Sequence, residues 1–310
     1  MISGWEQLAP LILTVITAST PLLFAAAGEL VTERSGVLNL GVEGLMVVGA
    51  LAAFAGTHAT GSAILGVMFG ALAGVVLAFV FAVLTLTLLA NQVATGLALT
   101  IFGLGLTALL GKGYVGVTVG NLPQLNIPGL TDLPFIGPIL FGQDAMVYLS
   151  FAAVIGISWV LSRTRIGLVL RAVGASHDSA HALGYPVIRI RYLATMFGGA
   201  LGGIAGSYLS LVYTPMWAEN LTAGRGWIAL ALVVFSTWRP WRLLLGAYLF
   251  GAITVIQLHA QGLGVAVPSE FLSMTPYLAT ILVLVVISRD KLKIKLNAPA
   301  CLGTGFRPTQ

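Results

Sequence analysis

The chain has 310 residues, of which 58% are hydrophobic and 8% are charged, and its mean hydropathy is +0.99. An ionised side chain at the bilayer centre costs about 2.5–3.5 kcal/mol on insertion scales, so this depletion of charge excludes a soluble protein and indicates several membrane spans. The pI near 9.6 comes from Lys and Arg in short loops, which indicates membrane orientation and excludes a nucleic-acid partner.

Nine apolar segments predict an all-α polytopic membrane protein with about nine transmembrane helices, in a range of eight to ten. A crossing needs about 20 residues. Two of the segments, 37–56 and 226–237, are short. The first span is expected to be retained, because the first twenty residues lack the basic start of a cleaved signal peptide. The longer segments are 8–30, 63–90, 92–111, 145–162, 192–213, 243–260 and 272–288.

Both short segments begin in stretches rich in Gly and Asn, at 35–44 and 220–226. Such interruptions predict two discontinuous helices whose freed backbone groups face a cavity. In the predicted topology the two segments run in opposite directions, as in an inverted repeat with the substrate path near the interface of its halves. The shared pattern is only a few residues long, so a chance match is the alternative.

The positive charges predict the orientation. Thirteen Lys and Arg residues fall on one side and only Lys112 and Arg225 on the other, which places the N-terminus outside and the C-terminus in the cytoplasm. Residues 1–288 are expected to form one transmembrane domain, followed by a cytoplasmic tail, 289–310. Basic residues expected in the cytoplasm include Arg34, Arg163, Arg165, Arg189, Arg191, Arg239, Arg242, Arg289, Lys291, Lys293, Lys295 and Arg307.

The predicted external loop, 112–144, is nearly uncharged and contains Pro123, Pro128, Pro134 and Pro138. This composition predicts irregular structure without a helix, suited to contacting a partner or closing a pore mouth. A solvated connecting loop is an equally good interpretation.

No motif predicts catalysis, a metal site or a bound cofactor. The string Gly111-Lys112-Gly113 lacks the Ser or Thr and the upstream spacing of a P-loop, so we do not expect this chain to hydrolyse ATP. His177 and His181 lie four residues apart but have no third ligand nearby, and a solvated helix face is the better interpretation. Cys301 is the only cysteine, which excludes an intrachain disulfide.

Polar residues at membrane depth are candidate functional residues, because unpaired ones are costly. Glu29 and Glu43 flank Glu33 and Arg34, and a structural ion-pair cluster at the inner boundary is the favoured interpretation of these acids. Neutral amides and hydroxyls, including Gln92, suit the hydroxyl groups or base edge of a nucleoside. Hydrogen bonds between helices explain the same residues equally well. The candidates for the substrate pathway are Asn39, Glu43, Asn91, Thr95, Asn220 and Thr222.

The predicted cytoplasmic loop 163–191 contains a segment of small residues, 171–184, that is expected to form one short polar helix. Gly184 and Pro186 end it, with Gly184 expected in the left-handed conformation. Small side chains on a basic helix suit a groove of another protein, and a solvated connector is the alternative.

Several strings resemble the permease subunits of bacterial ABC importers, and more closely the nucleoside and simple-sugar branch of the ribose and branched-chain amino acid permease family. The resemblance covers about residues 20–288. Its strings are GELVTERSGVLNLGVEG (28–44), NQVATGLALTIFGLG (91–105), RAVGASHDSAHALGYPV (171–187), NLTAGRGWIALALVVFSTWRPW (220–241) and SEFLSMTPYL (269–278).

The resemblance implies that residues 171–187 form the coupling helix that sits in a cleft of an ATPase subunit. His177-Asp178 and Tyr185 depart from residues common in the family, so the contact pattern is open. The candidate coupling residues are Arg171, Gly174, Asp178, Ala182 and Gly184.

The resemblance also implies a setting and partners. The chain would be a multi-pass protein of the bacterial cytoplasmic membrane, in contact with lipid. Two permease subunits, of which the second is expected to be a paralogue, would form the pathway. ABC ATPase subunits would use ATP and Mg, and an extracytoplasmic binding protein would deliver a nucleoside.

The alternatives keep the membrane architecture and change the cargo or the energy source. The permease could instead serve ribose, other simple sugars or branched-chain amino acids. A protein of another class, a stand-alone secondary transporter, would use Glu29 or Glu43 as a proton relay, and a channel is a third candidate.

Overall fold

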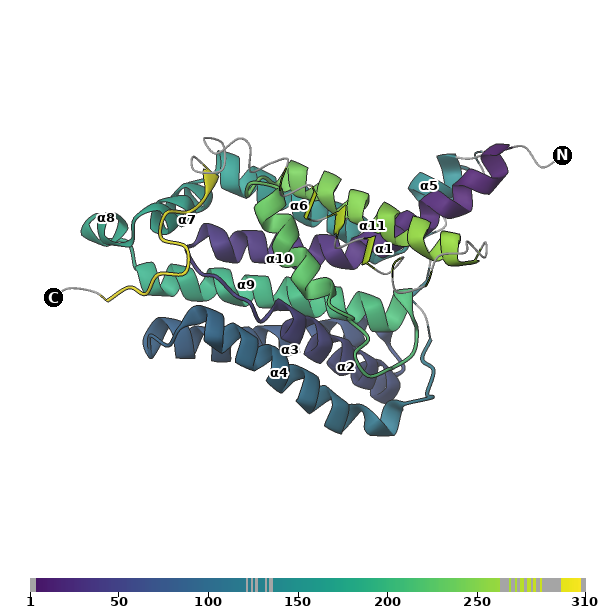
Figure 1. Ribbon diagram of the computed structural model, residues 1–310, viewed down its shortest axis with the longest axis horizontal. Coiled ribbons are helices and arrows are strands. Elements are labelled where there is room, and N and C mark those ends of the chain that lie inside the picture. The colour runs from purple at the N-terminus through teal and green to yellow at the C-terminus, as the bar shows by residue number, and fades with distance from the viewer. Residues whose placement is uncertain are drawn as a thin grey trace.

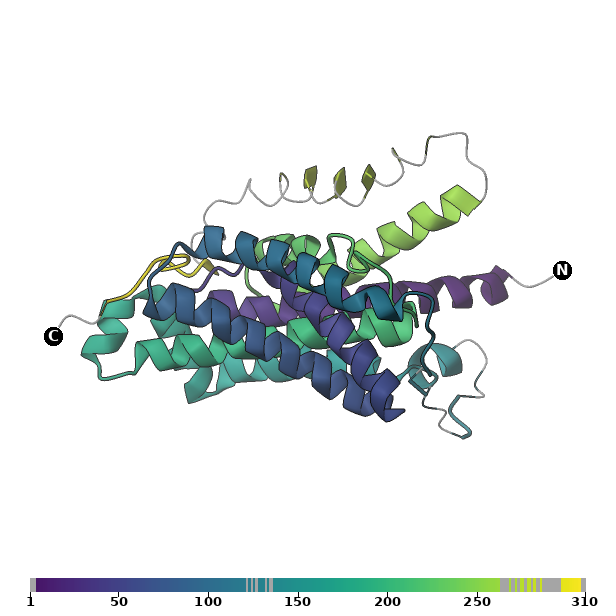
Figure 2. The same ribbon diagram turned by 90° about the horizontal axis from the view of Figure 1, so that it is seen from below.

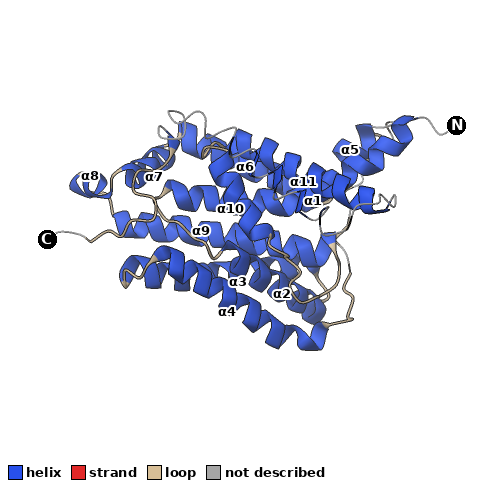
Figure 3. Cartoon of the chain, in the orientation of Figure 1, coloured by secondary structure: helices blue, strands red, loops and turns tan. Residues whose placement is uncertain are grey.

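The computed structural model describes residues 4–262 except 121, 124, 126, 127, 132, 134 and 135, isolated residues between 268 and 285, and residues 297–307. Within these ranges every regular element is helical (Figure 3). The elements are α1 (Gly4–Arg34), α2 (Val42–Thr60), α3 (Ala63–Ala82), η1 (Val83–Thr87), α4 (Gln92–Leu110), η2 (Gly111–Tyr114), α5 (Ile136–Phe141), α6 (Ala145–Arg163), α7 (Arg165–Ala175), α8 (His177–Ala182), α9 (Val187–Tyr208), η3 (Leu209–Tyr213), α10 (Arg225–Phe235) and α11 (Pro240–Gly262).

Seven helices in the described part are long and apolar enough to cross a membrane. They are α1, α2, α3 with η1, α4 with η2, α6, α9 with η3, and α11, while the apolar helix α10 is shorter. These eight elements correspond to eight of the nine predicted segments. The ninth, 272–288, is described only at isolated residues, and the basic residues 289–295 lie outside the described ranges.

Segments predicted to share a side of the membrane lie at the same end of the molecule. Figure 1 shows α7, α8 and the C-terminus at one end, and the N-terminus and α5 at the other. Figure 2 shows the same separation after a quarter turn. We refer to the two ends as the predicted cytoplasmic end and the predicted external end.

Helices α1, α2 and α9 form the interior and are more buried than α3, α4, α6 and α11. Glycines bring these backbones together: a Cβ atom at Gly206 would overlap the carbonyl oxygen of Met46, and one at Gly203 would overlap that of Gly70. In lipid, where apolar side chains gain little by leaving the solvent, such close backbone approach is what holds helices together. The high glycine content therefore serves packing.

Three local expectations are wrong. The segment 171–184 is not one helix but two, α7 and α8, because Ser176 adopts an extended conformation and its hydroxyl caps α8 by accepting from the Ser179 amide. The external loop contains the short helix α5, with Pro138 in its first turn, where no amide hydrogen is needed. Helix α9 begins at Val187, five residues earlier than expected.

The expected turn at Gly184 is confirmed. Its φ is +84°, and its amide donates to the carbonyl oxygen of His181 at 2.8 Å. The Tyr185 amide reaches back to Ala180 at 3.1 Å, which completes a Schellman-type end. The C-terminal end of α8 is thus fixed by its own backbone.

Candidate functional site

The two interrupted segments meet at the side chain of Glu43. One carboxylate oxygen accepts from the Thr222 hydroxyl at 2.5 Å and from the Gly224 amide at 2.8 Å. The other accepts from the Gly226 amide at 2.6 Å. Glu43 lies in the first turn of α2, and Gly224 is the N-cap of α10. One carboxylate therefore joins the N-terminal ends of two helices.

This junction follows from the chemistry of helix ends. The first amides of a helix have no partner within it, and its dipole favours negative charge there. Gly224 has φ +81°, which a side chain would strain, and a Cβ at Gly226 would press on the backbone of Glu43. The glycines of the second segment let its backbone reach the carboxylate of the first.

The segment between α1 and α2, residues 35–41, is named here the α1–α2 break. The amides of residues 35–37 still donate to carbonyl oxygens at the end of α1, but beyond them the chain leaves the helical pattern, and buried backbone groups without partners are costly in a membrane. Side chains from three helices supply the partners. Glu29 accepts from the Asn39 amide at 3.1 Å, Gln92 accepts from the Leu38 amide at 2.8 Å, Thr100 donates to the Leu40 carbonyl at 3.3 Å, and Arg191 donates to the Gly36 carbonyl at 3.1 Å.

The structure brings together three of the six predicted pathway residues. Asn39, Glu43 and Thr222 are buried near the junction, and the Asn39 side chain accepts from the Gly41 amide. Asn91 is exposed and caps α4, and Asn220 is exposed in a left-handed turn with φ +56°. Thr95 is half-buried in the first turn of α4.

The acidic and basic residues near the end of α1 have neutral partners. Glu33 accepts from the indole nitrogen of Trp238 at 2.5 Å. Arg34 donates to the carbonyl oxygens of Trp238 at 2.7 Å and of Asn297 at 3.0 Å. Instead of pairing with one another, these two residues hold the connection between α10 and α11. Trp238 was not singled out by the sequence, because its partner is 205 residues away.

The predicted coupling residues divide into an exposed and a buried group. Arg171, Asp178, Ala182 and Gly184 are exposed, whereas Gly174 is buried, because a Cβ there would overlap the carbonyl oxygen of Arg34. Sequence reasoning missed Leu183, which is 75% exposed at the tip of α8. The signal that could have identified Leu183 is its place as an apolar residue directly before a helix-ending glycine.

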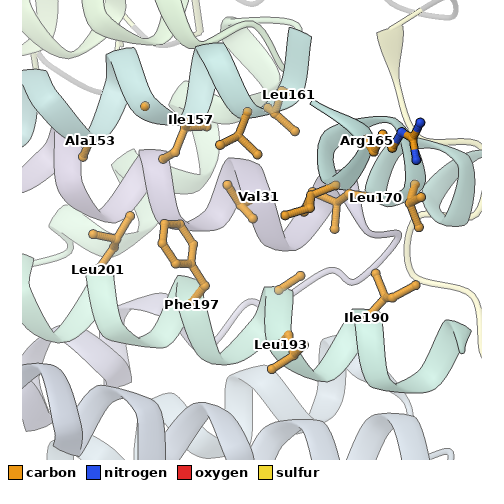
Figure 4. Close-up of a pocket in the computed structure, with 15 residues that line it drawn as sticks. Val31, Ala153, Ile157, Leu161, Arg165, Leu170, Ile190, Leu193, Phe197 and Leu201 are labelled. Atoms are coloured by element: carbon orange, nitrogen blue, oxygen red, sulfur yellow. The ribbon is translucent and has the colours of Figure 1, made fainter. Parts of the chain in front are cut away.

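A groove of about 700 Å³ runs between α6 and α9, with Val31 of α1 at its floor (Figure 4). Its lining is apolar apart from Arg165, at the start of α7. A second groove, of about 630 Å³, lies among α2, α3 and α4 and is also apolar. Apart from Arg165 in the first groove and Thr60 in the second, the linings offer none of the polar side chains that a polar solute needs, so we assign neither groove to cargo.

No group of three His, Cys, Asp or Glu side chains that could hold a metal ion occurs among the residues that the structure describes. The polar network described above combines hydrogen bonds from side chains to backbone groups with bonds between side chains, and it satisfies the buried groups of the α1–α2 break and of the start of α10.

Comparison with known proteins gives a consistent result. Residues 11–287 match the family described as "Branched-chain amino acid transport system / permease component". A candidate glucose ABC transporter permease protein of Haloferax volcanii is 41% identical, with 95% of this chain and 96% of the relative covered. The nucleoside ABC transporter permease protein NupC of Lactococcus lactis is 32% identical, covering 88% of this chain and 90% of the relative. The guanosine ABC transporter permease protein NupQ of Bacillus subtilis is 31% identical, with coverages of 88% and 92%.

Proposed function

This chain belongs to the family of branched-chain amino acid transport system permease components and is a multi-pass ABC transporter permease, and we propose that it forms the import pathway for a nucleoside. In this proposal a binding protein delivers the nucleoside at the external end. Two permease subunits alternate between outward and inward access, and ATPase subunits at the cytoplasmic end supply the energy. ATP and Mg are bound by those ATPase subunits.

The observation that carries the ATP-driven mechanism is the shape of α8. It projects from the predicted cytoplasmic end (Figure 1), its C-terminal end is fixed by the Gly184 turn, and Leu183 and Tyr185 expose apolar surface beyond it. An exposed apolar tip on a short helix suits a cleft in a second protein. Helix α8 is therefore the proposed contact with the ATPase.

Nucleosides are the first candidate cargo, because two relatives are named as nucleoside or guanosine permeases and the polar residues at membrane depth include neutral amides and hydroxyls. Simple sugars are the second candidate, and the 41% identity to the candidate glucose permease favours them. Both cargoes carry a hydroxyl-rich ring, so the same kinds of donors and acceptors serve either.

A proton-coupled secondary transporter is the rival of a different class. It needs a carboxylate that exchanges protons with water, yet Glu29 and Glu43 are each 2% exposed and accept hydrogen bonds from the protein. This arrangement favours a structural role for both. Uptake by the purified chain alone in liposomes under a proton gradient would support the rival.

Co-purification tests the proposal. The tagged permease, extracted together with its partner subunits, is expected to retain an ATPase, and uptake is expected to stop when the ATPase carries an inactivating substitution. A permease that never retains an ATPase, or uptake that survives the inactive ATPase, would contradict the proposal.

A further inference from the structure

The described part of the C-terminal tail, residues 297–307, returns to the predicted cytoplasmic end and lies against the base of α8. In Figure 1 it is the yellow trace beside α7 and α8. Composition alone predicts a solvated tail for these residues. The contacts show instead a segment attached to several helices.

Backbone hydrogen bonds fix the middle of the tail. The Cys301 amide donates to the carbonyl oxygen of Gly174 in α7 at 2.9 Å. The Gly303 amide donates to the carbonyl oxygen of Gly36 in the α1–α2 break at 3.1 Å. Arg191 of α9 donates to both Gly36 and Thr304, at 3.1 and 2.9 Å. One segment thus connects α7, α9 and the α1–α2 break.

Phe306 continues these contacts to α8. Its side chain is 6% exposed and packs in an apolar cluster with Val173 of α7, Ala180 of α8 and Val187 of α9. The rings of His177 and His181 lie 5.6 and 5.5 Å from its ring centre. Phe306 therefore covers the inner face of α8, and the opposite face, with Asp178 and Ala182, stays exposed.

Helix α8 has six residues, and helices shorter than about 12–15 residues are marginal in water without packing. Its orientation therefore depends on what it packs against. Its two buried residues are His177 and Ala180, and Phe306 contacts both. Loss of the Phe306 ring would remove the largest side chain of this cluster and leave Ala180 of α8 with Val173 and Val187.

We propose that residues 297–307 act as a strap that positions α8 for the ATPase and links α8 to the α1–α2 break. Phe306 is the positioning residue, and Cys301, Gly303 and Thr304 form the link. The inference rests on the proposed function of α8 as the ATPase contact. Any displacement of α8 pulls on the tail, and through Gly303 on the segment that joins α1 to α2.

The test compares Phe306→Ala with Phe306→Leu and Arg307→Ala in the full complex. Arg307 is exposed next to Phe306, so its loss is the matched control. We expect Phe306→Ala to lower the amount of retained ATPase and the uptake per ATP hydrolysed by about tenfold. Phe306→Leu is expected to restore most of both, and Arg307→Ala to change neither. Wild-type values for Phe306→Ala would overturn the strap while leaving the proposed function intact.

A measurement on the wild-type complex keeps the test independent of variant folding. Hydrogen exchange should be slow at the amides of Cys301 and Gly303, and the strap predicts further slowing there when the ATPase is bound. Exchange at the rate of an unstructured peptide at both positions would overturn the proposal. A wild-type permease that retains no ATPase would instead refute the proposed function.

Discussion

At the scale of single residues, Glu43 shows how one side chain supports two helix ends. Its carboxylate accepts three hydrogen bonds from residues 222–226, and each charge-assisted bond contributes about 1.5–3 kcal/mol. The chain offers Glu219 as a contrast, because that residue is exposed in the same loop. Comparing substitutions of the two residues therefore distinguishes the local structural role of Glu43 from a general effect of removing a negative charge.

We expect Glu43→Gln to lower the free energy of unfolding by about 2 kcal/mol, because an amide NH₂ would face a backbone donor. Thermal unfolding of the purified protein in detergent measures this change. Glu219→Gln is expected to leave the free energy of unfolding within about 0.5 kcal/mol of the wild type. Equal midpoints for all three proteins would show that Glu43 does not hold the start of α10.

His177 predicts a pH dependence at the same scale. Burial beside Phe306 and, to a smaller extent, the positive charge of Arg191 lower the pKa of His177 from its ordinary 6.5 to about 4, although the negative charge of Asp178 acts in the opposite direction. The charged form is therefore disfavoured in the fold. The contribution of neutral His177 to the free energy of unfolding is fully present above about pH 6.5. It decreases as the pH falls toward 4 and is lost below that pH.

The measurement is thermal unfolding of wild type and His177→Gln between pH 4.5 and 7.5. His181 is exposed, although its ring also contacts Phe306, and His181→Gln is the matched control. The wild type is expected to lose more stability than His177→Gln as the pH falls, with His181→Gln like the wild type. Parallel curves for all three would contradict the burial of a neutral His177.

At the scale of elements, the contact of α9 with α2 and α3 depends on glycine. A Cβ at Gly203 would overlap the backbone of Gly70, whereas a Cβ at Gly156 of α6 meets nothing within 4 Å. Alanine has the better helix propensity by about 0.8–1 kcal/mol. Replacing glycine by alanine is therefore expected to lower stability at position 203 but not at position 156.

We predict that Gly203→Ala destabilises the protein by about 1–3 kcal/mol, since neither backbone can yield without moving a helix. Gly156→Ala is expected to leave stability unchanged or to raise it slightly. The measurement is the thermal unfolding midpoint of each variant, compared with that of the wild type in the same detergent. A destabilised Gly156→Ala together with an unaffected Gly203→Ala would contradict the helix packing described here.

Sequence reasoning captured the elements that apolar length and composition specify. Eight predicted spans correspond to helices, because lipid demands long apolar helices, and the two Gly- and Asn-rich stretches lie mostly in the non-helical segments before α2 and α10. The junction of Glu43 with Thr222 was beyond prediction, since hydropathy carries no information about which breaks touch. Phe306 was missed for the same reason: its partners are 119 or more residues away in the chain.

At the scale of the whole molecule, the surface grooves described among the helices do not suit a polar solute. The two grooves are apolar, and the buried polar groups near Glu43 already bond to one another. The proposed function places the pathway for a polar solute between two permease subunits. The purified single chain in liposomes should show no saturable nucleoside uptake under a proton gradient, and robust uptake there would favour the secondary transporter.

The measurement that tests the central claim most directly is uptake by liposomes containing both permeases, the ATPase and the binding protein. Labelled guanosine is supplied with or without internal ATP and Mg, and with unlabelled adenosine, glucose, ribose or leucine as competitor. Our account predicts saturable uptake that requires ATP and is reduced by adenosine but not by leucine. Guanosine uptake that proceeds without ATP, or ATP-driven uptake of glucose with none of guanosine, would contradict it.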